Sequence, residues 1–397
     1  MRAVGSAPFL RYVAGVDLRF SDADRAFRDQ ARAWLAENVP SPALPSGDTD
    51  EGFAAHRTFE KHLFDEGWAV VSWPENYGGR GASLTQWLIF EEEYWRAGGP
   101  SRVAQNGIFL LAPALFHYGT DDQKERLLAP MARADVVWAQ AWSEPGAGSD
   151  LAAVKSWAER DDEAGGWRLF GQKTWCTRAA WCDRVFGLFR TDRSASRHAG
   201  LTYFMCDVHQ PGVRIQPFAR LDGDMGFAEV FFDGAFVPDA DILGDVGQGW
   251  SVAMATTSSE RGLSLRSPGR FLAAADRLAD LWRERRNTAD PALVHDVSSA
   301  LIDAAAYRWH TYATAARMAS GDAIGAEASL SKLFWSQMDL HITETAMKLL
   351  GEDADLDTGW GKAFQFALAG PIYAGTNEIQ RNIIGRRVLG LPREKRR

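Results

Sequence analysis

The chain has 397 residues, more than one ordinary hydrophobic core needs, so we expect two or three packed units. Its formal net charge is −8, from 44 Lys and Arg against 52 Asp and Glu, with no long run of one sign, which argues against nucleic acid as the main partner. The three cysteines (Cys176, Cys182 and Cys206) are odd in number and lack C-x-x-C spacing. That pattern argues against a disulfide framework and against zinc, and it favours a reducing, cytoplasmic setting.

Two apolar stretches could be mistaken for segments that enter a membrane. Residues 1–20 are expected to form a loose leader, because their apolar patch is too short for the core of a signal peptide. Residues 103–120 contain no Asp, Glu, Lys or Arg, as a membrane-spanning helix would. They do contain Gln105, Asn106, Pro113 and His117, so we expect a buried helix pair of a soluble protein.

Residues 21–134 are predicted to form an all-α domain. Ser21 and Asp24 have the spacing of a capping box, and an apolar stripe at helical spacing follows them. The same cap signal recurs at Ser83 with Gln86 and at Thr120 with Gln123, and a further helix is expected over residues 51–66.

Residues 135–244 are predicted to form a middle β domain. Short runs rich in β-branched and aromatic residues alternate here with loops rich in Gly, Asp and Pro. Such regular short strands predict a small β-sandwich or barrel. The strand-like runs are residues 136–142, 167–170, 184–189, 201–206, 213–218 and 229–232.

Residues 245–397 are predicted to be helical again. The long helical segments are residues 249–285, 291–319, 325–350 and 377–388. Segments of this length favour an antiparallel helical bundle. The fold class is therefore α+β multidomain, in the order helical domain, β domain, helical bundle.

The stretch WSEPGAGSD, residues 142–150, follows the first predicted strand. Its loop offers backbone N–H groups and hydroxyls beside an aromatic surface, which suits the polar edge of a flat heterocycle such as a flavin. It is not a phosphate-binding loop, because no Lys follows the glycines, and Leu151 stands where a dinucleotide loop needs its third Gly. A simple turn is the alternative reading.

Three stretches together resemble the acyl-CoA dehydrogenase family: WSEPGAGSD, then GQKTWCT at residues 171–177, then IYAGTNEIQRN at residues 372–382. They stand in the family's order and at about its spacing, and the resemblance covers residues 20–392. It implies the same α–β–α architecture, an FAD cofactor, an acyl-CoA substrate and an electron-transfer flavoprotein as electron acceptor. In such enzymes the cofactor carries the redox chemistry, and the protein supplies orientation and electrostatics.

The resemblance also implies roles for individual residues. The positions that match flavin contacts are Trp142, Ser143, Trp175, Thr177, Gly351, Thr376, Asn377 and Glu378. The positions that match contacts with the acyl-CoA are Ser149, Arg261, Ala374 and Gly375. Thr376 could also serve as the N-cap of the following helix.

The catalytic base departs from the commonest family pattern. Many members carry a Glu directly after the Tyr of the closing motif, where this chain has Ala374. A second branch carries its base in a Glu-Arg pair on the first long C-terminal helix, and Glu260-Arg261 matches that pair. We therefore expect Glu260 to be the general base, although a Glu-Arg pair on a helix is more often a solvated face.

The cofactor site departs from the family as well, which leaves alternatives open. Residues 285–290 do not match the segment with which family members reach a neighbouring subunit's cofactor, and Lys348 stands where Gln is common. We expect a homodimer or homotetramer, with a hetero-oligomer as the alternative. The other readings are a dehydrogenase or oxidase of carrier-bound acyl groups, and a partner subunit of low activity. The acyl group itself is left open: fatty, branched, steroid-derived or carrier-bound.

Overall fold

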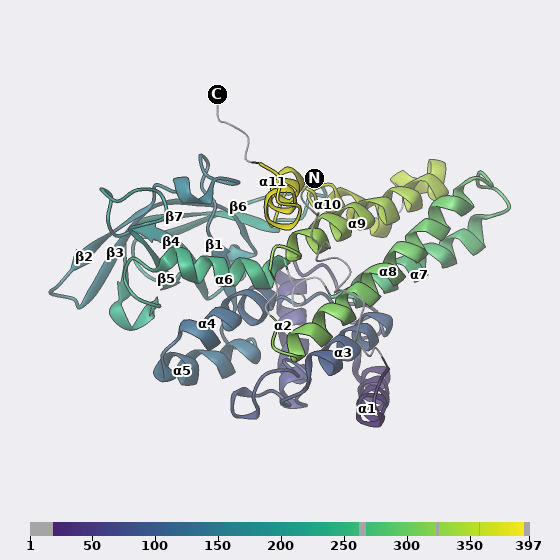
Figure 1. Cartoon of the computed structure of the whole chain (residues 1–397), viewed down its shortest axis with the longest axis horizontal. Helices are drawn as coiled ribbons and strands as arrows, with labels where there is room; N and C mark the ends of the chain where they lie inside the picture. Colours follow the sequence, from purple (N-terminus) through teal and green to yellow (C-terminus); the bar gives the residue numbers. More distant parts are fainter. Residues whose placement is uncertain (1–18, 262–266, 323–324, 357, 393–397) are drawn as a thin grey trace, which may run out of the picture.

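The computed structural model describes residues 19–261, 267–322, 325–356 and 358–392, with the backbone alone for residues 257–261 and 358. Three parts follow one another along the chain (Figure 1). A β-sheet lies to the left, a group of long C-terminal helices to the right, and the N-terminal helices below both. This is the order of domains that the sequence predicts.

The N-terminal part is entirely helical. Its helices are α1 (Asp22–Asn38), α2 (Asp50–Asp65), α3 (Leu84–Arg96), α4 (Ala112–Tyr118) and α5 (Asp121–Ala132), with a short turn η2 (Glu75–Tyr77) and a π-helix η3 (Asn106–Leu111). The three predicted capping boxes are confirmed: the hydroxyls of Ser21, Ser83 and Thr120 each accept the N–H three residues on, and the side chain there returns a bond.

The charge-free stretch 103–120 forms η3 and α4, which follow each other without a break. Most of its side chains are buried, and Leu111, Ala112, Ala114 and Leu115 are completely so. Among the described residues, no helix is both long and apolar enough to cross a membrane.

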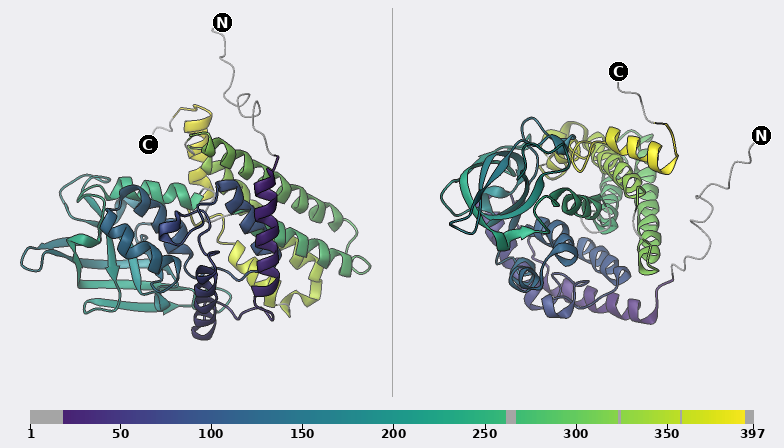
Figure 2. Two further views of the ribbon diagram at one scale, coloured as in Figure 1. Left: turned by 90° about the horizontal axis from the view of Figure 1, so that it is seen from below. Right: turned by 60° about the vertical axis from the view of Figure 1, so that its left-hand side comes forward.

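Eight strands of the middle part form one hydrogen-bonded sheet. Seven of them follow the order β6-β7-β3-β2-β4-β5-β8, and the eighth, β1, pairs with β4 along the same edge as β2. The sheet curls around an aromatic core that includes Trp138, Phe186, Phe189 and Phe204 (Figure 2). The strands are β1 (Trp138–Ala141), β2 (Trp157–Asp161), β3 (Gly166–Thr177), β4 (Arg184–Arg190), β5 (Leu201–Asp207), β6 (Val213–Phe218), β7 (Phe227–Pro238) and β8 (Ile242–Leu243). The sequence did not predict β2, which is short and polar, or the two-residue β8.

The C-terminal part is a bundle of long helices with its own core, which includes Phe271, Leu278, Trp335 and Ile342. Its helices are α6 (Gly249–Arg261), α7 (Pro268–Arg285), α8 (Leu293–Ala319), α9 (Ala328–Leu350), α10 (Thr358–Ala367) and α11 (Asn377–Ile383), with the 3-10 helix η7 (Gly351–Asp355) and the π-helix η8 (Ile384–Val388). The expected single helix over residues 249–285 is wrong. Ser267 is extended and Pro268 begins α7, because a proline disfavours the helical conformation in the residue before it.

Helix α3 carries three consecutive buried glutamates that dock the helices around it. Glu91 accepts a hydrogen bond from Ser267 at the start of α7 (2.8 Å). Glu92 receives both arms of Arg308 on α8 (2.6 and 3.0 Å), and Glu93 receives both arms of Arg32 on α1 (3.0 Å each). One turn of α3 therefore fixes the N-terminal domain against the C-terminal bundle.

Candidate active site

The loop after β1 is anchored through Glu144. Its carboxylate accepts hydrogen bonds from the Nζ of Lys173 (2.8 Å) and from the N–H groups of Lys155 (2.6 Å) and Ser156 (2.9 Å). Lys173 is completely buried in β3 and also donates to the carbonyl of Leu188 (2.8 Å). The first two sequence motifs are therefore one structural unit, joined by a buried ion pair that the sequence analysis did not predict.

Burial opposes ionisation of Glu144, but the charge of Lys173 and the three hydrogen bonds prevail and lower the pKa of this carboxyl group below its ordinary value. The glycines of the loop face open space, so a side chain at Gly146 or Gly148 would meet no other part of the described chain within 4 Å of its Cβ. The loop is thus held at its base and open at its tip, where Ser149 is exposed.

A bulge in β3 presents Trp175 to solvent. The register between β3 and β7 shifts between Lys173 and Cys176, and Trp175 adopts a left-handed conformation with φ of +59°. For a residue other than glycine, such a backbone conformation costs a free energy of order 1–3 kcal/mol. Strain of this kind gathers at functional sites, so it makes Trp175 a candidate site residue. The indole is 60% exposed. The rings of Phe218 and Phe227 meet it edge-on, and their centroids lie 5.2 and 5.6 Å from the centroid of the indole.

Polar groups adjoin the bulge that carries this ring. The N–H of Thr174 donates to the carbonyl of Ser143 (2.9 Å), which brings the loop after β1 against the bulge, and Thr177 ends the same strand. In the described part of the chain, the indole N–H of Trp142 is buried and makes no hydrogen bond. The flat surface of Trp175, the half-buried hydroxyls of Ser143 and Thr177, and the unpaired indole N–H of Trp142 would together fit a flavin ring with a polar edge.

The closing motif forms a tight turn between α10 and α11. Ala374 and Gly375 both have positive φ, +57° and +80°. The side-chain amide of Gln380 donates to both of their carbonyls (3.0 and 3.2 Å), and the hydroxyl of Thr376 caps α11 by accepting the N–H of Ile379 (3.3 Å). Both expectations for Thr376 remain compatible, because capping uses only part of the capacity of its hydroxyl.

Asn377 is used inside the bundle rather than at its surface. Its side-chain oxygen accepts hydrogen bonds from the Nζ of buried Lys332 (2.8 Å) and from the hydroxyl of Ser336 (3.0 Å) on α9. Glu378 is exposed and lies 3.7 Å from Arg381. The backbone N–H of Asn377 donates to the carbonyl of Pro371 (2.8 Å), so both the side chain and the backbone of Asn377 fix the turn.

Gly351 is separated from the rest of the site within one chain. It follows the last residue of α9, whereas Ser336, which contacts Asn377, lies in the first half of that helix. Fifteen residues of helix put Gly351 about 22 Å from Ser336 along the axis. Gly351 therefore lies far from the closing motif within one chain, and its contact with the cofactor stays a prediction.

Helix α6 borders the part of the middle domain that contains Trp142. Thr256 is buried, and its hydroxyl meets that of Tyr203 at 3.5 Å, while the Tyr203 ring lies edge-on to Trp142 (6.3 Å). Glu260 follows Thr256 by four positions in the same helix. The side chains of Glu260 and Arg261 lie outside the described residues.

Family models for acyl-CoA dehydrogenases match three parts of the chain: the N-terminal domain over residues 21–135, the middle domain over residues 139–235 and the C-terminal domain over residues 247–389. The acyl-CoA dehydrogenase IpdE1 of Mycobacterium tuberculosis is 39% identical over 386 residues, which cover 93% of this chain and 98% of that protein.

Two solved structures are similar throughout. The ChsE4-ChsE5 complex from Mycobacterium tuberculosis has a TM-score of 0.79 at 26% identity and covers 96% of this chain and 100% of that one. The Tcur3481-Tcur3483 steroid ACAD has a TM-score of 0.84 at 24% identity, with coverage of 96% and 100%, and supports the fold alone. With three domain models matched in order and a full-length relative, the chain belongs to the acyl-CoA dehydrogenase family, oxidoreductases that act on acyl-CoA and use FAD as cofactor.

Proposed function

We propose that the chain dehydrogenates an acyl-CoA between the α and β carbons, giving the trans-2-enoyl-CoA, with Glu260 as general base. The observation that carries the proposal is the distribution of carboxylates. Residues 373–375 of the closing motif contain no acid, whereas α6 carries Glu260 one turn after Thr256, the residue that meets Tyr203 beside Trp142. Helix periodicity assigns residues four apart to one face of a helix.

The remaining roles follow from the positions of the side chains. Trp175 and Thr177 would cover the flavin and bond near its N5, while Trp142 and Ser143 would meet its polar edge. Bound there, FAD would accept at N5 the hydride that leaves the β carbon and pass the electrons to an electron-transfer flavoprotein.

The acidity of the α-proton depends on the thioester oxygen. The backbone N–H of Ala374 would donate to this oxygen and so stabilise the negative charge that develops as Glu260 removes the proton. Ser149 would line the acyl-CoA channel, Arg261 would bind the CoA portion, and Gly375 would let the backbone approach the substrate closely.

Glu260→Gln tests the proposal, because it keeps the shape of the side chain and removes the proton acceptor. The assay is anaerobic bleaching of bound flavin by an acyl-CoA substrate, with Glu284→Gln on the exposed end of α7 as the control. We expect a loss of about 10²–10⁴-fold for Glu260→Gln, the usual effect of a general base, and none for the control. Equal bleaching rates in wild type and Glu260→Gln would rule out the assignment.

A second candidate function is a subunit of a hetero-oligomeric dehydrogenase. The separation of Gly351 from the rest of the site within one chain favours an assembly, and the similar ChsE4-ChsE5 structure is a complex of two named proteins. The FAD content of the purified chain distinguishes the two, because a homo-oligomeric enzyme carries one FAD per chain. A panel of short, branched, long, steroid-derived and carrier-bound acyl thioesters, with oxygen uptake recorded, would identify the substrate and separate dehydrogenase from oxidase.

A further inference from the structure

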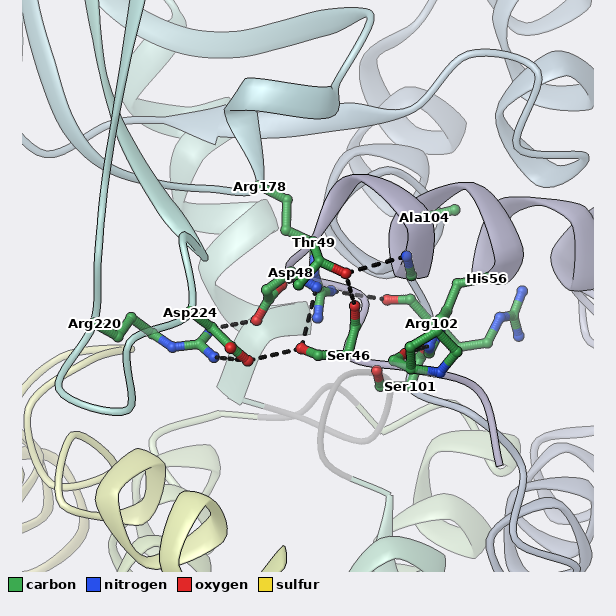
Figure 3. A network of polar contacts seen from close by, with 12 residues as sticks. Ser46, Asp48, Thr49, His56, Ser101, Arg102, Ala104, Arg178, Arg220 and Asp224 are labelled. Carbon is green, nitrogen blue, oxygen red and sulfur yellow. Dashed lines mark hydrogen bonds and ion pairs between the residues drawn. The ribbon is translucent and has the colours of Figure 1, made fainter. Parts of the chain in front are cut away.

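A buried carboxylate of the N-terminal domain, Asp48, lies between two arginines of the middle domain (Figure 3). Asp48 is 5% exposed and stands just before α2. One of its oxygens accepts a hydrogen bond from the Nε of Arg178 (2.5 Å), and the other pairs with the guanidinium of Arg220. Burial opposes the charge of Asp48, yet the two arginines lower the pKa of the carboxyl group.

The two arginines adjoin the two segments that support the exposed Trp175, the end of β3 and the loop after β6. Arg178 directly follows Thr177, the last residue of β3, and its N–H donates to the carbonyl of Gly226 (2.9 Å). Arg220 follows β6 by two residues, in the loop that joins Phe218 to Phe227. Because Phe218 and Phe227 are the rings that hold Trp175, Asp48 fixes the strand end and the loop that support this indole.

The same network reaches the C-terminal domain. Asp224, in the loop between β6 and β7, accepts hydrogen bonds from the hydroxyl of Ser46 (2.7 Å) and from the Nζ of Lys362 on α10 (2.9 Å). Arg220 also pairs with Asp222 (2.9 Å) and Asp224 (3.4 Å). Three carboxylates and three cations from all three domains thus converge on the loop behind Trp175.

We propose that Asp48 is a positioning residue for the cofactor: it holds the supporting loop and the end of β3 so that Trp175 presents its ring to the flavin. The inference rests on the proposed position of the flavin against Trp175. Asp48 itself lies beneath the loop and touches neither substrate nor flavin in this role. Its loss leaves Arg178 and Arg220 without the carboxylate that joins them, so the loop can shift while the domains stay folded.

The chain offers a matched control in Asp241. This carboxylate is also buried (6% exposed) and also joins two arginines, Arg126 of α5 (2.7 Å) and Arg184 of β4. It lies just beyond Pro238, at the opposite end of β7 from Phe227, and 11 steps along a strand span about 36 Å. Removing either charge disturbs a similar interdomain pair, but only Asp48 adjoins the support of Trp175.

The experiment compares Asp48→Asn, Asp241→Asn and Trp175→Leu. Thermal unfolding of each apoprotein reports stability, and titration with FAD, followed by flavin fluorescence, reports affinity. We expect the two Asp→Asn variants to lose similar stability, while Asp48→Asn and Trp175→Leu weaken FAD binding by about tenfold or more and Asp241→Asn does not. The visible absorbance band of bound flavin should also shift in Asp48→Asn but not in Asp241→Asn.

The outcomes separate the inference from its premise. If Trp175→Leu binds FAD as wild type does, the proposed position of the flavin fails, and the inference fails with it. If Trp175→Leu weakens binding but Asp48→Asn and Asp241→Asn bind FAD equally well, the positioning role alone is overturned. Should Asp48→Asn not fold, Arg220→Lys keeps the charge but loses the planar fork that spans the carboxylates. Weaker FAD binding by Arg220→Lys then supports the role, and unchanged binding overturns it.

Discussion

Glu144 and Lys173 show how single residues hold the loop after β1. Lys173 has no exposed surface, so its ammonium depends on the carboxylate of Glu144. Replacing one partner of a buried pair leaves the other charge uncompensated, which typically destabilises a protein by about 3–5 kcal/mol. We therefore expect Glu144→Gln to lower the free energy of unfolding by that order, as measured by denaturant titration, with exposed Glu163→Gln as the control.

The same pair predicts a pH dependence. The pKa of Glu144 in the folded chain lies below its ordinary value of 4.5, so its contribution to stability is complete above about pH 4.5. That contribution is lost as the pH falls through the lower, folded pKa. The stability difference between wild type and Glu144→Gln should consequently shrink below pH 4.5. A difference that stays constant down to pH 3 would show that Glu144 is not the ionised partner of Lys173.

At the scale of elements, α3 joins its neighbours through three glutamates: Glu91 and Glu92 reach the C-terminal bundle, and Glu93 reaches α1. Burial raises the pKa of Glu91, whose hydrogen-bond donors, Ser267 and Trp95, are uncharged. The arginines around Glu93 overcome burial and lower its pKa. Glu92 has a single strong partner, Arg308, which makes this pair the simplest to test.

We expect Glu92→Gln to destabilise the chain by about 3 kcal/mol, because it leaves Arg308 against a neutral group in a largely buried contact. Replacing both partners, Glu92→Leu with Arg308→Met, removes the unpaired charge and should recover much of that loss. A double-mutant cycle by denaturant unfolding measures the coupling. Additive effects of the two single changes would contradict a direct role of the pair in docking α8 on α3.

The elements differ in how far the sequence could predict them. The capping boxes at Ser21, Ser83 and Thr120 depend on residues three apart, so local patterns were sufficient. Helix α10 was missed because its glycines and aromatic residues lower its helix propensity, and packing against α9 overrides that preference. The bulge at Trp175 depends on its pairing with β7, about 50 residues away, which no local pattern encodes.

The candidate site divides in the same way. Motifs indicated the residues that we propose to meet the cofactor, because their residue types and spacing are local. The residues that hold those motifs were not predicted: Lys173 reaches Glu144 across 29 positions, and Arg178 reaches Asp48 across 130. Such pairs become visible only when the fold brings the strands and the N-terminal loop together.

At the scale of the whole molecule, α8 carries an exposed apolar face. Val294, Leu301, Ile302 and Trp309 are between 37% and 66% exposed and recur at about seven-residue spacing, so they lie along one side of the helix. Contiguous exposed apolar surface of this kind marks an interface with another protein. We predict a dimer or a dimer of dimers, and light scattering that shows a stable monomer at micromolar concentration would contradict this.

An assembly would also complete the cofactor site, because Gly351 lies about 22 Å along α9 from the residue that contacts Asn377. If Gly351 serves the site of a neighbouring chain, each site combines Trp175 of one chain with Gly351 of another. Gly351 has a φ of +58°, so Gly351→Ala strains its backbone without adding a large side chain.

Mixing two inactive variants tests this arrangement. We expect Trp175→Leu and Gly351→Ala to bind FAD poorly when each is prepared alone. In a mixed dimer, the Gly351→Ala chain contributes an intact Trp175 and the Trp175→Leu chain contributes an intact Gly351, so one of the two sites is restored. Co-refolding the two variants should therefore recover flavin absorbance that neither shows alone. No recovery in dimers shown by native mass spectrometry to contain both chains would mean that Gly351 does not act across the interface.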